Sequence, residues 1–305
     1  MNPTQRNMRV EWKFLGALSL IAAIIALGGV AFAQESPASP VDQQPTLGVL
    51  DHFKCYQAEG KSVNDLAFLR DQFGIADKTY ERDIVTDPKL FCNPVRKIHE
   101  TAGAVVNVGI SNRNNHLVWY DIKPAINEQF KTRQVIVTNQ FAPNGQKLLV
   151  IKPEFLAVPT QKVSVDGKPT DQGAPQGLDH FKCYKVEGPP LIAQSARLWD
   201  QFNSANTWDT FKVMRAQYLC NPTAKAHFTG FNDETGAAQF TTATIQHPAD
   251  HLVCYALQPN MQALHKLVVN NQFGSPQQLI TLQTKLLCVP STKRVIVPNG
   301  DTDNT

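Results

Sequence analysis

Six cysteines are the residues of this sequence best suited to covalent chemistry. Their number is even, no two form a Cys-x-x-Cys pair, and all lie downstream of an N-terminal segment with the features of an export signal. Exported proteins with an even number of cysteines usually form disulfides, whereas zinc sites generally show closely spaced ligands. We therefore predict disulfides, no metal site and no cysteine nucleophile. The six are Cys55, Cys92, Cys183, Cys220, Cys254 and Cys288.

Histidines recur at equivalent places in a repeated pattern, and four of them follow Asp or Asn. Imidazole could serve as a metal ligand or a general base. We favour a structural role, a hydrogen bond within each repeat unit, because a catalytic residue is rarely needed four times in one chain. They remain weak binding candidates. The four are His52, His116, His180 and His251, and His99 and His227 form a further equivalent pair.

An Asp/Asn-Gln-Phe motif also occurs four times. Its phenylalanines are expected in the core, with the polar side chains hydrogen-bonded to backbone at a strand end. The alternative is a sugar-binding surface, in which an aromatic ring stacks on the sugar and amides donate hydrogen bonds. The phenylalanines are Phe73, Phe141, Phe202 and Phe273.

Carboxylates repeat with the same unit, at Asp51, Asp71, Asp179 and Asp200. A pair of them could act as in a glycoside hydrolase. Capping or solvated carboxylates are the interpretation we prefer. The sequence contains no Gly-x-Ser-x-Gly, no His-Glu-x-x-His and no phosphate-binding glycine loop. We assign no catalytic residue and no cofactor.

A long internal repeat positions all these residues. Leu50–Tyr56 returns unchanged as Leu178–Tyr184, and each copy begins again in a weaker form at Asn115–Tyr120 and Asp250–Tyr255. The underlying unit is a quarter of the form His-x-x-Cys-Tyr, then Asp/Asn-Gln-Phe, then Cys-x-Pro. Four quarters are expected to form two tandem domains.

The repeat also predicts how the cysteines pair. Cys254 and Cys288 correspond to Trp119 and Ala157 in the first copy, so both cysteines of that quarter are missing together. Joint loss is what a bonded pair would show, and we expect the large Trp beside the small Ala to fill the space. In the chain-entropy model each bridge is worth about 4 kcal/mol. The predicted pairs are Cys55–Cys92, Cys183–Cys220 and Cys254–Cys288.

Residues 1–33 are typical of a secretory signal peptide. Three basic residues precede an apolar stretch from Phe14 to Phe32, and Ala31-Phe32-Ala33 provides a cleavage site after Ala33. The apolar stretch is also long enough for an uncleaved transmembrane anchor. We expect cleavage, and hence a secreted or periplasmic protein that is not held in the membrane.

Short apolar runs bounded by polar or turn-forming residues predict an all-β protein. Ser62 to Gln72 lacks a complete helical stripe and is expected to be a loop or short turn. Each predicted domain is a disulfide-linked sandwich or barrel of two pseudo-symmetric quarters. The predicted segments are a disordered linker at 34–48, domains at 49–162 and 177–295, a linker at 163–176 and a flexible tail at 296–305.

Charge excludes two classes of partner. The chain has 29 Lys and Arg against 26 Asp and Glu. The first 33 residues contain three of the basic residues and one acidic residue, which leaves 26 (29 − 3) against 25 (26 − 1). A nearly neutral chain lacks the basic patch of a nucleic-acid binder and the polybasic segment that binds anionic lipid.

The Leu-Asp-His-Phe-Lys-Cys-Tyr, Asp-Gln-Phe and Leu-Cys-Asn-Pro series resembles an uncharacterised exported domain of bacterial proteins, which also occurs in tandem. The resemblance covers nearly all of residues 49–295 and implies location and architecture, with no established activity. We expect a non-catalytic binding or envelope-interaction module, whose partner could be an extracellular glycan or an envelope protein. A hydrolase of extracellular polymers and a purely structural surface protein are the alternatives. Thr101–Asn114 and Thr229–Ala249 differ most between the copies, so specificity would lie there.

Overall fold

The computed structural model describes residues 50–74, 80–101, 104–125, 129–232, 235, 238–258, 261–296 and 302–303. These residues form strands and loops, and no helix occurs among them, which confirms the all-β prediction. The strands are β1 (Phe53–Gly60), β2 (Asp65–Arg70), β3 (Glu81–Pro94), β4 (Arg96–Thr101), β5 (Ala104–Val108), β6 (His116–Pro124), β7 (Arg133–Asn139), β8 (Ala142–Val165), β9 (Lys168–Pro169), β10 (His180–Glu187), β11 (Gln194–Trp199), β12 (Asp209–Phe231), β13 (Ala238–Ala243), β14 (His251–Gln258), β15 (Gln262–Asn271), β16 (Gly274–Ile296) and β17 (Thr302–Asp303).

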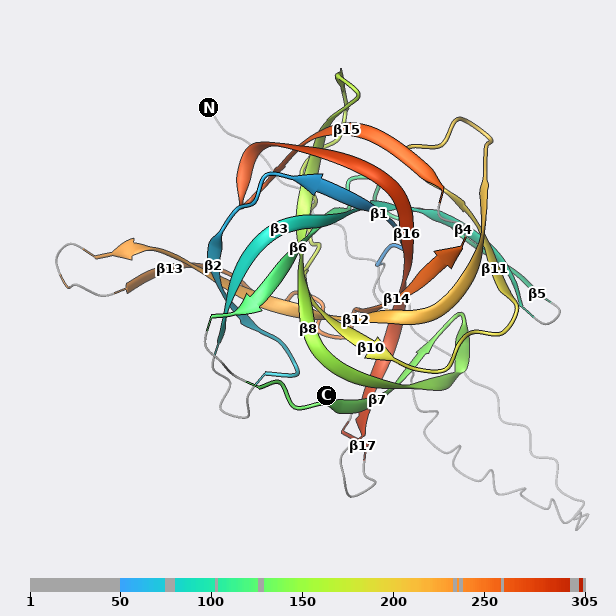
Figure 1. Ribbon diagram of the computed structural model, residues 1–305, viewed down its shortest axis with the longest axis horizontal. Coiled ribbons are helices and arrows are strands. Elements are labelled where there is room, and N and C mark those ends of the chain that lie inside the picture. Colours follow the sequence, from blue (N-terminus) through green and yellow to red (C-terminus); the bar gives the residue numbers. More distant parts are fainter. Residues whose placement is uncertain are drawn as a thin grey trace, which may run out of the picture. The chain divides into compact units, whose positions relative to one another are not determined.

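The first and last strands of each quarter form a closed antiparallel ring (Figure 1). The pairing runs β1–β3–β6–β8–β10–β12–β14–β16 and returns from β16 to β1. A sheet that closes on itself is a barrel, whereas a sandwich requires two separate sheets. The structure therefore has one barrel that draws four strands from each sequence repeat.

The middle strand of each quarter pairs with the last segment of the opposite quarter, which is the end of a long strand in three quarters and the separate strand β4 in the first. β2 pairs with β12 and β11 with β4, while β7 pairs with β16 and β15 with β8. Each repeat therefore completes the sheet of the other. The prediction of two separate domains is not confirmed, because Pro45–Thr305 forms one compact unit. Repeat similarity shows which segments are equivalent but not which segments pair.

Three disulfides lie inside the ring, in the pairs that the repeat predicts: Cys55–Cys92, Cys183–Cys220 and Cys254–Cys288. Each joins residues that face one another on neighbouring antiparallel strands. Cross-strand neighbours are close enough for a disulfide without any loop movement.

The second quarter has Trp119 opposite Ala157 at the same register position. Both side chains are fully buried in the cluster that contains the cysteines. The Trp119 ring contacts Tyr218 on β12, at a centroid distance of 5.9 Å, which places the ring in the interior. The pair thus fills the space that a disulfide occupies in the other three quarters.

Two further hydrophobic clusters lie on the outer side of the ring. One is formed with β7 and β11, the other with β2 and β15. Alternate residues of a strand point to opposite faces, so a ring strand supplies the interior with Cys55 and the outer layer with Tyr56 or its equivalents. The middle strands therefore cover the barrel and bury its outer face.

Several segment predictions change. Ser62 to Gln72 contains strand β2, because Ala67 and Leu69 alternate into the outer cluster. Residues 163–176, expected as a linker, begin as the end of β8, and Asp166 and Gly167 then turn the chain with positive φ into β9.

Other predictions fall where the structure describes nothing. The signal peptide and the 34–48 linker lie outside the described residues, as does most of the 296–305 tail. Within the described part, no helix is long and apolar enough to cross a bilayer.

Candidate functional site

The Asp/Asn-Gln-Phe motif forms the same local turn four times. The side-chain oxygen of Asp71, Asn139 or Asn271 accepts a hydrogen bond from the backbone N–H two residues later at 2.9 Å. Asp200 accepts the same bond at 3.2 Å. This is an Asx turn, which short carboxylate and amide side chains favour. It holds the phenylalanine of the motif over the barrel's outer face.

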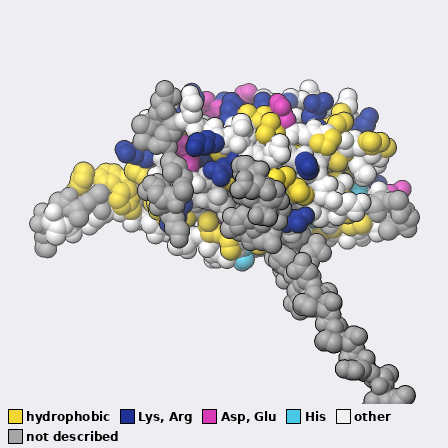
Figure 2. Space-filling view, turned by 90° about the horizontal axis from the view of Figure 1, so that it is seen from below, with side chains coloured by type: hydrophobic (Ala, Val, Ile, Leu, Met, Phe, Trp, Pro, Cys, Tyr) yellow, Lys and Arg dark blue, Asp and Glu magenta, His cyan; other side chains and the backbone are white. Residues whose placement is uncertain are grey.

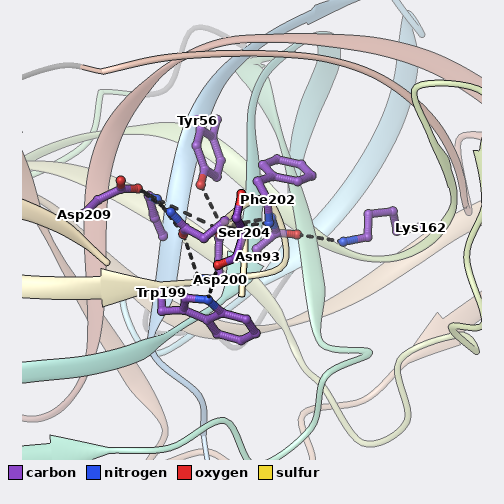
Figure 3. Close-up of polar contacts among 10 residues, drawn as sticks. Tyr56, Asn93, Lys162, Trp199, Asp200, Phe202, Ser204 and Asp209 are labelled. Carbon is purple, nitrogen blue, oxygen red and sulfur yellow. Dashed lines mark hydrogen bonds and ion pairs between the residues drawn. The ribbon is translucent and has the colours of Figure 1, made fainter. Parts of the chain in front are cut away.

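Each turn is the centre of a polar cluster drawn from three quarters. The Asp200 cluster consists of Tyr56, Asn93, Lys162, Asp200 and Phe202 (Figure 3). Asp200 Oδ2 accepts hydrogen bonds from the Tyr56 hydroxyl at 2.7 Å and from Asn93 Nδ2 at 3.0 Å. Lys162 Nζ donates to Asn93 Oδ1 at 3.2 Å. Burial and the charge of Asp200 raise the pKa of Tyr56 well above its usual value, so the phenol remains a donor.

The Asp71 cluster repeats this arrangement with Tyr184, Asn221, Lys293 and Phe73. Asp71 Oδ2 accepts from the Tyr184 hydroxyl and from Asn221 Nδ2, each at 2.9 Å. Lys293 Nζ donates to Asn221 Oδ1 at 2.9 Å. The tyrosine and asparagine come from the second repeat and the aspartate from the first, so the cluster joins the two repeats.

A second buried lysine accompanies each aspartate cluster. Lys54 Nζ lies 2.6 Å from Asp209 Oδ2 and 3.8 Å from Asp200 Oδ1. Lys182 likewise contacts Glu81, and its Nζ lies 2.9 Å from Asp83 Oδ2. Buried charges need partners because transfer from water is costly. These ion pairs supply them.

The Asn139 cluster consists of Lys97, Asn139, Phe141, Tyr255 and Ser291. Asn139 Nδ2 donates to the Tyr255 hydroxyl at 3.0 Å and to Ser291 Oγ at 2.8 Å. The Tyr255 hydroxyl is also 3.3 Å from Asn139 Oδ1, to which it can donate. The amide thus has a donor as well as an acceptor toward the tyrosine, whereas the carboxylates of the first two clusters only accept from it.

The Asn271 cluster consists of Tyr120, Thr160, Lys225, Asn271 and Phe273. Asn271 Nδ2 donates to the Tyr120 hydroxyl at 2.9 Å and to Thr160 Oγ1 at 3.2 Å. The two asparagine clusters also lack the second lysine, because Val118 and Val253 occupy the positions of Lys54 and Lys182.

Phenylalanines of the motif pack as predicted for core residues. Phe73 and Phe141 are buried, while Phe202 and Phe273 are partly buried against the outer cluster. A lysine Nζ lies over each ring, 4.2 to 5.2 Å from its centroid. A cation over an aromatic face is attractive, and more so when both are buried.

Sequence reasoning missed these four lysines. Each follows the proline of its Cys-x-Pro segment by three residues, so Pro-x-x-Lys recurs in every quarter. Burial lowers the pKa of Lys97 and of Lys293 to about 7, and of Lys162 and of Lys225 to about 8. The spacing was visible in the sequence, but exposed lysines are common enough to hide it.

The repeat-equivalent histidines lie beside these lysines. Burial lowers the pKa of His52 and of His116 to about 3 and that of His180 to about 4, and the neighbouring lysine acts in the same direction; His251 is lowered as well. A neutral imidazole avoids a second buried charge.

The hydrogen bonds of His116 and His180 leave the quarter, contrary to the expectation of a bond within it. His180 Nε2 lies 2.9 Å from Gln272 Nε2, in the fourth quarter, and His116 Nε2 lies 2.7 Å from Gln172 Oε1, in the segment between the repeats. For His180 the barrel brings the motif glutamine of another quarter to the imidazole, whereas Gln172 lies outside the motif; the sequence pattern alone could not show either contact.

The remaining motif carboxylates cap loops. Asp51 accepts from the backbone N–H groups of Ser111 and Asn112 at 2.6 and 3.1 Å, and Asp179 accepts from those of Gln246 and His247 at 2.8 Å. No group of three or more His, Cys, Asp or Glu side chains suited to a metal ion occurs among the described residues. The repeated polar residues thus connect parts of the barrel.

An exposed apolar face lies where the copies differ. It extends across β3, β2, β12 and β13, and Figure 2 shows hydrophobic side chains gathered on the projecting arm that carries β13. Phe228 contacts Phe231 and Phe240, at centroid distances of 5.1 and 5.8 Å, and Phe240 contacts Phe68 at 5.3 Å. Phe231 is 66% exposed and Phe240 44%. The face consists of Leu66, Phe68, Ile84, Phe228, Phe231 and Phe240.

The equivalent face of the other repeat is mostly polar. It extends across β12, β11, β4 and β5. Ser195, Arg197, Lys212 and Glu100 occupy the places of Leu66, Phe68, Ile84 and Phe228, and Val105 takes the place of Phe240. The same scaffold is therefore stable with a charged surface, and the apolar face is not required by the fold.

A family model described as a repeat of unknown function (DUF7450) matches residues 116–290. The matched range begins at the histidine of the second quarter and ends at the Cys-x-Pro proline of the fourth. No curated protein and no solved structure matches the chain.

Proposed function

The chain belongs to this family of repeats of unknown function, and we propose that it is an exported, non-catalytic module that binds an envelope or secreted partner through the apolar face of β2, β3, β12 and β13. The observation that carries the proposal is the exposed aromatic arm around Phe228, Phe231 and Phe240. Contiguous exposed apolar patches on soluble proteins usually mark interaction sites.

The internal comparison supports the choice of face. A surface with no binding role would be expected to tolerate polar residues, and the other repeat shows that this scaffold accepts them at the matching positions. Aromatic side chains are also the type most enriched at the energetic centre of protein interfaces. A partner with an apolar surface fits this face best.

Export through a cleaved signal peptide belongs to the same proposal. Three disulfides are typical of extracellular proteins, because reducing compartments keep thiols reduced. The mature N-terminus is expected at Gln34, in the secreted or periplasmic fraction. Sequencing that terminus checks the expectation, and an intact N-terminus on membrane-bound protein would favour the anchor instead.

The binding experiment compares three immobilised proteins, each as oxidised residues 34–305. They are the wild type, Phe231→Ser/Phe240→Ser and the control Val105→Ser, which removes a side chain 66% exposed at the matching place of the other face. Envelope and secreted fractions of the source cell are passed over each, with insoluble polysaccharides as parallel baits. We expect saturable capture of one component by the wild type and the control, reduced at least tenfold in the double variant.

Two results would overturn the proposal. Equal capture by the double variant would remove the face from the interaction. Breakdown of a polysaccharide bait by the wild type would favour the hydrolase instead. Thermal melting of all three proteins distinguishes loss of binding from loss of folding.

A further inference from the structure

A cavity is lined mainly by basic and apolar side chains. It adjoins the apolar face, because Arg82 and Lys123 of its lining are the cross-strand partners of Phe68 and Ile84. It has a volume of about 710 Å³, within the range of small-molecule sites. Phe73, Phe130, Ile122, Pro124 and Pro153 supply apolar surface. The cationic residues of its lining are Arg82, Lys123, Lys131, Arg133 and Lys152.

The negative charges of the lining are already paired. Its two carboxylates, Glu81 and Asp83, both contact the buried Lys182. Lys152 has Glu154 at 3.1 Å, but no ion pair joins Lys131 or Arg133 to another described residue. The cavity therefore carries positive charge that the described protein does not neutralise.

Arg133 also has a hydrogen-bond donor without an acceptor. Its Nη2 donates to the carbonyl oxygen of Phe73 at 2.9 Å, and the guanidinium lies 5.4 Å from the Phe73 ring centroid. Its Nε is buried without an acceptor among the described residues. An unpaired buried donor is unfavourable, and a nearby anion would offset part of that cost.

The other copy of the scaffold provides an internal control. Thr210, Gln258, Ala263, His265 and Gln283 occupy the repeat positions of the five cations. At this matching place His265 stacks on Phe202 at 4.2 Å and contacts Asp166. The barrel is thus built without these five cations in one copy.

We propose that the cavity lined by Phe73, Phe130, Lys123, Lys131 and Arg133 binds a small organic anion that carries a carboxylate and a ring. The cations attract the carboxylate and the apolar floor contacts the ring face. An aromatic acid and a sugar acid both have this chemistry. The inference does not rest on the proposed partner of the apolar face.

The test is titration calorimetry of the oxidised protein at low salt with 2-naphthoate, its neutral analogue 2-naphthamide, and digalacturonate. We expect saturable binding of at least one anion, and the anion that binds identifies the aromatic or the sugar source. In Lys123→Gln/Lys131→Ala, which installs the residues of the other copy, the affinity is expected to fall at least tenfold. Lys147→Gln/Lys212→Gln removes two exposed cations outside the lining and should bind like the wild type.

Three results would overturn the inference. These are no saturable binding of either anion to the wild type, equal binding of 2-naphthamide, and unchanged affinity in Lys123→Gln/Lys131→Ala. Matching melting temperatures of the variants ensure that each result reports on the cavity.

Discussion

The clusters built on Asp71 and Asp200 share a scaffold with those built on Asn139 and Asn271, yet they bind their tyrosines through different groups. In the aspartate clusters the hydroxyl donates to a carboxylate. A second buried lysine lies beside each of them: Lys54 is 3.8 Å from Asp200, and Lys182, beside the Asp71 cluster, pairs with Asp83. In the asparagine clusters an amide donates to the hydroxyl, and valine replaces that lysine.

The difference shows that the motif residue (Asp or Asn) and the residue at the position of Lys54 (Lys or Val) vary together. A carboxylate appears where Lys54 or Lys182 is present, and an amide appears where valine is present. A buried carboxylate without a cation is strongly unfavourable, whereas burial lowers the pKa of the buried Lys97, so that amine can lose its charge. Residues of one set are therefore expected to tolerate change only together.

The largest expected effect comes from Lys54→Met. The substitution leaves Asp200 and Asp209 without their cation, so the free energy of unfolding should fall by about 3–5 kcal/mol. Lys97→Met, in an asparagine cluster, removes a lysine with no carboxylate partner. It should change the free energy of unfolding by less than about 1 kcal/mol. Urea unfolding at pH 7 measures both. Equal losses would contradict the distinction between the clusters.

A double-mutant cycle sharpens the same comparison. Lys54→Val and Asp200→Asn each convert one position to the residue of an asparagine cluster, and each alone should destabilise the protein. The double variant should lose less than the sum, with a coupling of about 2 kcal/mol. Additive losses in urea unfolding would show that the two positions are independent.

The dependence of stability on pH tests the buried lysines. Burial lowers the pKa of Lys97 to about 7, below its unfolded value of about 10.4. Between these values the unfolded state binds more protons, so stability rises with pH, by at most about 1.4 kcal/mol per unit from this lysine. Lys97→Met should have a flatter profile from pH 7 to 9. Parallel profiles of wild type and variant would contradict the shift.

The smallest expected difference between the two kinds of cluster concerns the tyrosine hydroxyl. Tyr56→Phe breaks a hydrogen bond to a charged acceptor and should cost about 2 kcal/mol, whereas Tyr120→Phe breaks neutral bonds and should cost about 1 kcal/mol. Chemical denaturation of both variants measures the difference. A larger loss in Tyr120→Phe would reverse the proposed ranking.

Sequence reasoning was strongest where the repeats could be compared position by position. The joint replacement of Cys254 and Cys288 by Trp119 and Ala157 was enough to predict the pairing and the filler. The four lysines over the motif phenylalanines recur equally plainly as Pro-x-x-Lys, but lysine is so common on protein surfaces that this spacing alone does not indicate burial.

Other features depend on contacts that no repeat pattern contains. Pairing of β1 with β16 closes the ring, and those strands lie at opposite ends of the described chain. Each long strand, such as β8, also leaves the ring and pairs in the outer layer. Strands and histidines therefore find partners in other quarters, whereas the sequence analysis expected two domains and histidine hydrogen bonds within one quarter.

The central claim is that the two repeats form one barrel, and unfolding of the oxidised protein tests it most directly. Trp119 reports on the first repeat and Trp199 and Trp208 on the second, so two variants that each keep one reporter set, with phenylalanine elsewhere, can be followed by fluorescence in urea. A shared sheet predicts one transition, with the same midpoint for both reporters once each variant is referenced to its own circular dichroism. If the fluorescence midpoint of a variant differed from the midpoint of its own circular dichroism, the result would instead show two independently stable domains.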